Sequence, residues 1–348
     1  MDGSNGKRNG AGKRALVTGG AGFLGSHLCA RLLEDGYEVV AMDNLATGSM
    51  RNLRPLLGRG LIQFIEQDVV NPDEAQLAGF RADRIFNLAC CASPLHYQAD
   101  PEKTIRTCID GSLNMLHLAR QSGARIFLSS TSEVYGEPEV HPQMESYRGS
   151  VSSIGPRACY DEGKRCAEAA FFDYHRVHGT EIKVARIFNT YGPSMQADDG
   201  RVVSNLIVQA LRNEPMTING DGSQTRSFCY VDDLIEGIVR LMDSPAEVTG
   251  PVNLGNPSEV TVLQLSTRII ELTGSRSKLR HRPMPVDDPT RRCPDITLAR
   301  QSLGWAPQVS LDEGLRRTIA WFEETLANGH LDLGTDSLLQ MEINSGCN

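Results

Sequence analysis

Tyr160 and Lys164, four residues apart, are the residue pair in this sequence with the clearest catalytic potential. At positions i and i+4 of a helix both side chains lie on one face, so the ammonium group can approach the phenol oxygen. A nearby cation stabilises the phenolate and lowers the pKa of the tyrosine. Such a tyrosine can remove the proton of a sugar or steroid hydroxyl while a hydride leaves. Because this spacing also occurs by chance in many helices, the pair needs support from elsewhere in the chain.

That support comes from a glycine-rich segment that directly follows the apolar run 15–18. Gly19, Gly22 and Gly25 are spaced by three, which lets the chain turn tightly and lets the backbone approach a pyrophosphate at a helix N-terminus. Asp43 ends the next apolar run, where its carboxylate can accept hydrogen bonds from both ribose hydroxyls of an adenosine. Because the same carboxylate would repel a 2′-phosphate, we predict NAD as the cofactor rather than NADP.

Polar residues also follow two later apolar runs. Thr131 and Glu133 come after the run 126–129, and active sites of open α/β sheets lie at the carboxyl ends of parallel strands. We therefore expect both side chains to face the nicotinamide; the alternatives are a capping hydroxyl and a loop carboxylate that bonds the backbone. Asp68, after the third run, is expected beside the adenine, with a solvated loop aspartate as the alternative.

Short apolar runs alternate with amphipathic segments from Arg14 to about residue 190, which predicts βαβ units and a doubly wound parallel (Rossmann) sheet. The expected helices span 26–35, 104–122 and 160–178. Glycine and proline are frequent after residue 190, as in a smaller lobe packed on the sheet. We predict a disordered lead (1–13), a mainly NAD-binding domain (14–190), a mainly nucleotide-sugar-binding lobe (191–327) with strands that return to the sheet, and a tail (328–348).

The composition narrows the class of protein. The 348 residues contain 35 Lys+Arg and 43 Asp+Glu, a net charge of −8, which argues against general binding of nucleic acid or anionic membranes. Neither an apolar stretch of about 18 residues nor a secretory signal is visible, so we expect a cytoplasmic protein. The nine cysteines are scattered and include no familiar zinc spacing; we expect packed thiols and no metal.

The motifs TGGAGFLG, YDEGK and IFNTYGP resemble the extended short-chain dehydrogenase/reductases that act on nucleotide sugars, and the resemblance runs from about residue 14 to 325. Longer strings are similar to the UDP-glucuronate decarboxylase branch of that family: TSEVYG, IGPRACYDEGKR, DGRVVSN, GDGSQTRSFCYVDDLI, PVNLGNP and DDPTRRCPDI. The resemblance implies NAD-dependent decarboxylation of UDP-glucuronate to UDP-xylose through a 4-keto intermediate. It also implies a homodimer formed through the helices 104–122 and 160–178.

The resemblance further implies positions for the cofactor, the catalytic groups and the substrate. Around NAD it places Gly22, Phe23, Leu24, Asp43, Asn44, Thr47, Gly48, Asp68 and Val69. In the catalytic positions it places Thr131, Glu133, Tyr160 and Lys164. Toward the sugar acid and UDP it places Tyr97, Arg106, Asn114, Asn189, Arg226 and Arg292. We also expect Leu88, Thr107 and Thr190 at the cofactor and Val203 at the substrate. Guanidinium groups suit diphosphate and carboxylate oxygens, although Arg226 and Arg292 could also be solvated surface residues.

Two departures from the family pattern leave the substrate contacts open. Ser194 stands where the block after Asn189 usually has an arginine, and the segment 147–153 lacks the usual Trp and Asn-Pro. Three rival functions also remain. A 4,6-dehydratase would need an Asp–Glu pair where this chain has Ser132-Glu133, and a 4-epimerase would tolerate a small neutral residue at 133. A non-catalytic NAD sensor would be expected to lose Tyr160 or Lys164. UDP-galacturonate differs from UDP-glucuronate only at C4 and is not separated by the sequence.

Overall fold

A parallel seven-stranded sheet forms the centre of the molecule in the computed structural model, which describes residues 12–58, 60–73, 81–197 and 200–328. The predicted doubly wound fold is confirmed. Strand β1 lies between β2 and β4, so the chain order reverses there and opens a crevice at the carboxyl ends of these strands. The order across the sheet is β11 (Val252–Leu254), β6 (Ile182–Ile187), β5 (Arg125–Thr131), β4 (Arg84–Asn87), β1 (Arg14–Thr18), β2 (Glu38–Asp43) and β3 (Ile62–Glu66).

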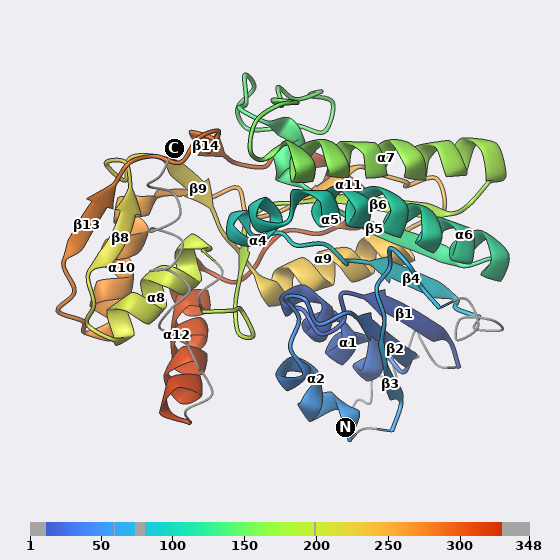
Figure 1. Ribbon diagram of the computed structural model, residues 1–348, viewed down its shortest axis with the longest axis horizontal. Coiled ribbons are helices and arrows are strands. Elements are labelled where there is room, and N and C mark those ends of the chain that lie inside the picture. Colours follow the sequence, from blue (N-terminus) through green and yellow to red (C-terminus); the bar gives the residue numbers. More distant parts are fainter. Residues whose placement is uncertain (1–11, 59, 74–80, 198–199, 329–348) are drawn as a thin grey trace.

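Helices cover both faces of this sheet (Figure 1). Alternate residues of β1 point to opposite sides, because successive side chains of a strand do so. Ala15 and Val17 join one buried cluster, and Leu16 joins the other. The first cluster includes α1 (Phe23–Glu34), α2 (Met50–Leu57) and α9 (Val231–Asp243), and the second includes α6 (Ser112–Ser122) and α7 (Ala158–His178).

The predicted helix 104–122 has a different geometry from the one expected. It begins as α5 (Pro101–Arg106), widens to a π-helical segment η1 (Thr107–Gly111) and continues as α6. At Gly111 a Cβ would lie 2.7 Å from Cγ2 of Val69, so only a glycine lets the segment pass this close to the end of β3. Short α4 (Pro94–Ala99) precedes α5.

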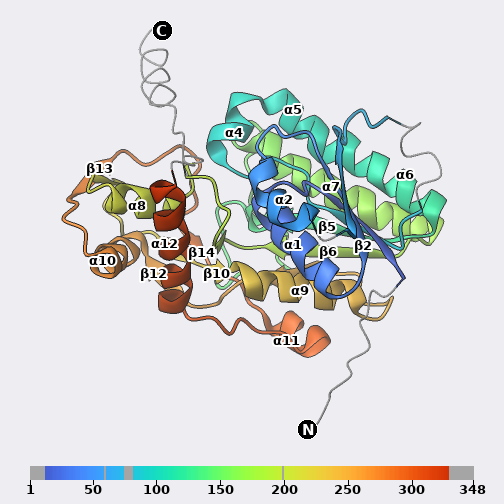
Figure 2. The ribbon, with the colours of Figure 1, turned by 90° about the horizontal axis from the view of Figure 1, so that it is seen from below.

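A second lobe packs beside the sheet, where α8, α10 and α12 lie together (Figure 2). The chain returns from this lobe to the sheet through α9 and β11, and α11 (Thr297–Leu303) packs against both. The lobe contains α8 (Val202–Leu211), α10 (Val262–Thr273), α12 (Leu311–Ala327), the parallel pair β8 (Met216–Asn219) and β13 (Leu279–Arg282), and the three-stranded sheet β12 (Glu259–Thr261), β9 (Thr225–Ser227) and β14 (Arg291–Arg292); β7 (Thr190–Tyr191) pairs with β10 (Cys229–Tyr230).

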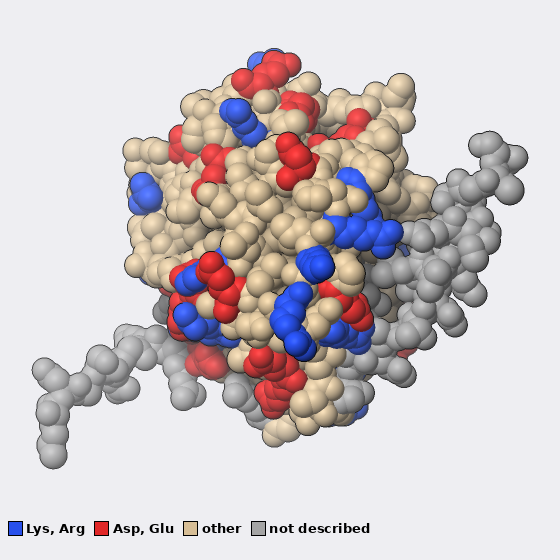
Figure 3. Space-filling view, turned by 90° about the vertical axis from the view of Figure 1, so that its left-hand side faces the viewer, with Lys and Arg blue, Asp and Glu red and all other residues tan. Residues whose placement is uncertain are grey.

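Basic and acidic side chains are interspersed on the outer face of this lobe (Figure 3). Among the described helices, none has the length and apolar character needed to cross a membrane. The predicted lead and tail lie outside the described residues, except for residues 12–13 and 328.

Candidate active site

The glycine-rich turn leaves a helix N-terminus open to an anion. Gly19 has φ 69°, a conformation that favours glycine, and a Cβ on Gly25 would lie 2.0 Å from the Gly19 carbonyl oxygen. The N-cap of α1 is Gly22, so no side chain caps the N–H groups of the first turn. Free N–H groups at a helix N-terminus bind phosphate well, so the turn fits the pyrophosphate of a dinucleotide.

Asp43 lies at the carboxyl end of β2, next to this turn, and its side chain is buried. Its carboxylate accepts hydrogen bonds from the N–H groups of Ala21 (3.0 Å) and Leu45 (2.8 Å). Burial raises the pKa of Asp43, although these backbone hydrogen bonds oppose the shift. A Cβ on Gly48 would lie 2.7 Å from the Asp43 carboxylate, so the glycine lets the loop after β2 close around it. The role of Asp43 in binding the ribose of the cofactor stays a prediction.

Asp68 and Val69 form a second wall at this end. Asp68 accepts a hydrogen bond from Asn44 (2.9 Å) and pairs with Lys103 (3.4 Å), a residue that the sequence reading missed. Burial by itself would raise the pKa of Asp68, but the hydrogen bonds from Val70, Asn44 and Lys103 together lower it. Asn114 donates to the carbonyls of Val69 (2.9 Å) and Val70 (3.0 Å). The structure thus places Asn114, predicted at the substrate, against this cofactor-side loop.

Four predicted catalytic residues meet at the carboxyl end of β5. Tyr160 is buried, and its hydroxyl is hydrogen-bonded to that of Thr131. The Glu133 N–H donates to Thr131 Oγ1 (3.2 Å), which leaves the Thr131 proton free to point at Tyr160. Lys164 Nζ donates to the Ser129 carbonyl (2.9 Å) and lies 5.9 Å from the Tyr160 ring centroid.

We expected Lys164 to lower the pKa of Tyr160, and this prediction is wrong: the groups of the chain together raise it. Burial raises the pKa of Tyr160 well above its ordinary value, and the thiol of Cys90 adds to the shift. The hydrogen bond from Thr131 opposes the increase without overcoming it. A phenolate at this position therefore needs more positive charge than Lys164 supplies.

Tyr97, predicted at the substrate, stacks directly on Tyr160, with ring centroids 5.0 Å apart and ring planes at 4°. Near Tyr160, the thiols of Cys90 and Cys108 approach each other to 3.3 Å. Both thiols influence the Tyr160 hydroxyl electrostatically. Tyr160 thus has one aromatic ring stacked on it and two thiols close enough to act on its hydroxyl.

Three arginines and two carboxylates form a buried cluster next to Tyr97. Glu133 Oε2 accepts hydrogen bonds from Arg157 Nη2 (2.6 Å) and Arg292 Nη2 (3.2 Å). Asp288 accepts from Arg226 (2.9 Å) and Arg157 (3.3 Å). Burial opposes ionisation of Glu133, but the charges of Arg292, Arg157 and Arg226 lower its pKa to about 2. Glu133 is therefore a carboxylate that neutralises arginines, and it has no proton to donate near neutral pH.

The cluster keeps polar atoms that no described residue satisfies: Tyr97 Oη, Arg157 Nε, Arg292 Nε and Asp161 Oδ1 are all buried and without a hydrogen-bond partner. Burial and the nearby charge of Glu133 raise the pKa of Asp161 to about 7. Three guanidinium charges then face two carboxylates and a largely neutral Asp161 at pH below 7. Buried polar groups are normally satisfied, so the cluster fits an anionic ligand.

The sequence reading missed Arg157, Asp161 and Asp288. Arg157 and Asp161 were within reach of a helical argument, since they lie three residues before and one residue after Tyr160 at the start of α7. Asp288 had no such signal. It comes from a loop 131 residues beyond Arg157, and only the fold brings the two together.

Arg106 is not brought to this cluster in the structure. Its side chain is 51% exposed and pairs with Asp110 on the same helical ridge (3.2 Å). Val203 is buried on α8, and the Asn189 carbonyl accepts from the Cys229 N–H (2.9 Å). The predicted substrate contacts of all three residues stay predictions.

The remaining predicted cofactor residues contact other parts of the chain, and their role at the cofactor stays a prediction. The Leu88 N–H donates to Thr18 Oγ1 (3.2 Å), and the Thr47 carbonyl accepts from Gln196 (2.6 Å). The hydroxyls of Thr107 and Thr190 donate to the carbonyls of Lys103 (2.7 Å) and Phe188 (2.9 Å). Phe23 and Leu24 begin α1.

The two departures from the family pattern are both ordered. Ser194 adopts φ 68°, and the preceding Pro193 carbonyl is bound to His27 of α1 (2.9 Å). Tyr147 stacks on Tyr135 (6.0 Å, 13°), and the backbone of Ser150 bonds to Tyr135 and Glu137. Both segments therefore keep a defined backbone despite the altered residues.

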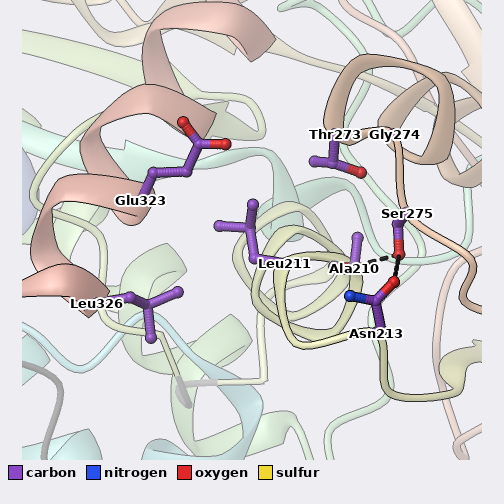
Figure 4. Close-up of a pocket in the computed structure, with 8 residues that line it drawn as sticks. All are labelled: Ala210, Leu211, Asn213, Thr273, Gly274, Ser275, Glu323 and Leu326. Carbon is purple, nitrogen blue, oxygen red and sulfur yellow. Dashed lines mark hydrogen bonds between the residues drawn. The ribbon is translucent and has the colours of Figure 1, made fainter.

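A separate depression of about 340 Å³ lies in the second lobe, between α8, α10 and α12 (Figure 4). Ser275 at its edge donates to the Ala210 carbonyl (2.6 Å) and contacts Asn213. Its lining includes one carboxylate, Glu323, and none of the residues described above. The chemistry-bearing groups lie elsewhere, at the carboxyl ends of the sheet strands.

The sequence model described as the NAD dependent epimerase/dehydratase family matches residues 15–255. This chain belongs to that family. Family membership confirms the predicted resemblance and NAD as the cofactor. A protein named UDP-glucuronic acid decarboxylase 3 of Arabidopsis thaliana is 53% identical over 303 residues, 87% of this chain and 86% of its own length. UDP-glucuronic acid decarboxylase 1 of Danio rerio is 52% identical over 90% of this chain and 73% of its own length.

Solved structures of the epimerase/dehydratase family have the same fold. The epimerase Mth375 from Methanothermobacter thermautotrophicus superposes with a TM-score of 0.86 at 32% identity, covering 93% of this chain and 96% of its own. UDP-glucuronic acid 4-epimerase from Bacillus cereus, solved with UDP-glucuronic acid and NAD, has a TM-score of 0.82 at 28% identity and covers 89% of this chain and 99% of its own.

Proposed function

We propose that this chain catalyses the NAD-dependent decarboxylation of UDP-glucuronate to UDP-xylose through a 4-keto intermediate. One observation carries the proposal. The hydroxyl pair of Tyr160 and Thr131 stands beside a buried arginine cluster with unsatisfied N–H groups. Relatives at about half identity that carry the name UDP-glucuronic acid decarboxylase support the same substrate and reaction.

Tyr160 removes the proton of the sugar 4-hydroxyl, with Thr131 completing the hydrogen-bonded path. Bound NAD would supply the hydride acceptor for oxidation at C4 and the hydride donor for the final reduction, and its positive ring would favour the Tyr160 phenolate. The glycine turn at the start of α1, Asp43 and the Asp68 loop would hold the cofactor. Lys164, anchored on the Ser129 carbonyl, places its charge near the phenol ring.

Oxidation at C4 leaves a ketone β to the C6 carboxylate, and the C5–C6 bond then breaks with release of CO₂. The bonding electrons flow into the ketone and form an enolate. Protonated Tyr160 and the Thr131 hydroxyl act as preorganised donors to the enolate oxygen. A proton from water, added at C5, then restores the ketone, and Tyr160 returns its own proton to the C4 oxygen when the ketone is reduced.

The arginine cluster binds the anionic parts of the substrate. Arg157 and Arg292 present buried, unsatisfied Nε–H groups, and guanidinium forks match carboxylate and phosphate oxygens. Glu133 holds both arginines in place and sets a negative charge near the substrate carboxylate, which favours its loss. Its low pKa argues against the alternative that it handles a proton at C5.

The low pKa of Glu133 also weighs against the rival reactions. A 4,6-dehydratase needs an acid to protonate the leaving 6-hydroxyl, and Glu133 is held ionised by Arg157 and Arg292. Its neighbour Ser132 supplies only a hydroxyl, which donates to Glu133 (3.4 Å). A 4-epimerase has no need of a charged group at position 133. The decarboxylase reaction uses the charges of Arg157, Arg292 and Glu133, as described above.

The direct test incubates the purified chain with UDP-glucuronate and NAD⁺ and follows nucleotide sugars and CO₂ by mass spectrometry. We expect UDP-xylose from the parent chain and turnover lower by about 10²–10⁴-fold in Tyr160→Phe. A released 4-keto pentose would mean that the return hydride step is weak. UDP-galacturonate is assayed in parallel. Bound NAD without turnover of either sugar acid would reject the proposal in favour of the sensor.

We also infer a homodimer and a cytoplasmic location. The ridge of α5 and α6 and the helix α7 lie side by side as the outer layer of one sheet face (Figure 1). Ile105 on α5 and Val177 on α7 are exposed apolar side chains that a partner copy would cover. Light scattering of the purified chain should give the mass of two chains, and cell fractionation tests the location.

A further inference from the structure

Outside the candidate active site, His141, Glu259 and Cys293 meet from three separate segments of the chain. His141 lies in the loop after Tyr135, Glu259 begins β12, and Cys293 directly follows β14. One nitrogen, one carboxylate oxygen and one sulfur atom from these residues all lie within 4.8 Å of one another. His141 Nε2 is 2.9 Å from Glu259 Oε2. We propose that the three residues bind a divalent cation of the zinc type.

The donor set favours this class of cation. Zinc is held by thiolate, imidazole and carboxylate ligands, and sites with three protein ligands keep a fourth position for water. Magnesium and calcium prefer oxygen ligands only, so a set with one sulfur and one nitrogen disfavours them. The side chains of His141 and Glu259 are 31% and 26% exposed, whereas Cys293 is buried. The cation enters from the solvent side, and Cys293 releases its thiol proton when the metal–sulfur bond forms.

Hydrogen bonds around the three residues already orient them. The Cys293 N–H donates to Gln143 Oε1 (2.8 Å), and the Gln143 N–H donates to the Cys293 carbonyl (2.9 Å). Gln143 is fully buried, so this reciprocal pair holds Cys293 against the His141 loop. Thr225 donates to Glu259 Oε1 (2.7 Å) and leaves Oε2 facing His141. Such outer contacts fix the ligand geometry of metal sites.

The position of the site gives the cation a structural role. Cys293 directly follows Arg292, and Thr225 directly precedes Arg226. Strands β12, β9 and β14 form one sheet, which carries Arg226 and Arg292, two of the three arginines of the cluster described above. A bound cation would tie the His141 loop to this sheet and hold the arginine-bearing strands in register. This role does not depend on which reaction the active site catalyses.

The test uses the full chain after removal of metal with a chelator, followed by titration with Co²⁺ and Zn²⁺. We expect one Co²⁺ per chain with an intense near-ultraviolet charge-transfer band from thiolate to cobalt. Cys293→Ser should abolish the band, and His141→Gln should weaken Zn²⁺ binding at least about tenfold. Cys166→Ser, which removes an exposed thiol of α7, should keep both properties.

Two further measurements can reject the site: the cobalt band of a second cysteine variant and the effect of Zn²⁺ on the melting temperature. The thiols of Cys90 and Cys108, which lie close to each other, are an alternative pair of cobalt ligands. A band that is lost in Cys90→Ser but kept in Cys293→Ser would overturn the assignment. No band in the parent chain would also overturn it. His141→Gln changes a partly exposed side chain, so its melting temperature without metal should equal the parent's. Zn²⁺ should raise the melting temperature of the parent and of Cys166→Ser only; an equal rise in His141→Gln rejects the site.

Discussion

The cofactor end and the substrate end of the candidate site are built in opposite ways. At the cofactor end, the backbone N–H of Ala21 in the glycine turn donates to the carboxylate of Asp43, 22 positions further along the chain. At the predicted substrate end, Glu133 reaches Arg292 across 159 positions, and the contacts are between charged side chains. One end therefore depends on backbone shape and the other on a balance of buried charges, so they should respond differently to substitution.

Arg292→Met should have the largest effect, because it removes one partner of a buried carboxylate. Glu133 then keeps its charge with less compensation, and we expect the free energy of unfolding to fall by about 3 kcal/mol. Urea denaturation measures the change. Adding Glu133→Gln removes the stranded charge and should restore much of the loss. If the single and double variants are equally unstable, the charge balance is not what holds this end together.

Gly25→Ala should damage the cofactor end alone. The added Cβ would lie 2.0 Å from the Gly19 carbonyl oxygen, so the turn must shift where it would meet the pyrophosphate. We expect NAD to bind about 100-fold more weakly by calorimetry, with UDP binding unchanged. Gly58→Ala is the matched control, since nothing lies within 4 Å of a Cβ there. Equal losses of NAD and UDP affinity would show that the two ends are not independent.

Asp161→Asn should change the pH dependence of the substrate end. With a pKa of about 7, Asp161 is neutral below that pH and ionised above it, where it cancels one arginine charge. KM for an anionic sugar nucleotide should therefore rise through pH 7 in the parent chain, by about fivefold. The Asn variant should keep the low KM at pH 8. Steady-state kinetics from pH 6 to 8 compare the two, and parallel curves would assign the titration to another group.

Arg106→Ala should have the smallest effect, because the half-exposed guanidinium pairs with Asp110 on its own helix. Surface pairs of this kind contribute little, and KM should change by less than about threefold. An increase above tenfold would mean that Arg106 turns toward the substrate on binding, as the resemblance implies.

The fold was predictable because its pattern is local. Strands with buried residues on both faces read as apolar runs, and the predicted runs 15–18 and 126–129 lie within β1 and β5. The Tyr160 and Lys164 pair was predictable for the same reason, since helical spacing alone puts both on one face of α7. The π-helical turn at Thr107–Gly111 was missed because it depends on how the ridge passes Val69.

The raised pKa of Tyr160 could not be read from spacing. Spacing indicates which charge stands near the phenol, whereas the shift is dominated by burial, which depends on everything packed around it. The same holds for Asp161, whose neighbours along the chain give no sign of a pKa near 7.

The sequence by itself determined the alternation of strands and helices, the glycine turn, and the placement of Tyr160 and Lys164 on one helix face, because each rests on residues close together in the chain. Only the tertiary structure decided which charges meet. It joined Glu133 to Arg157 and Arg292, and it gathered His141, Glu259 and Cys293 although their spacing shows no metal motif. Side chains from distant segments become neighbours only when the strands that carry them pair, and pairing is a property of the whole fold.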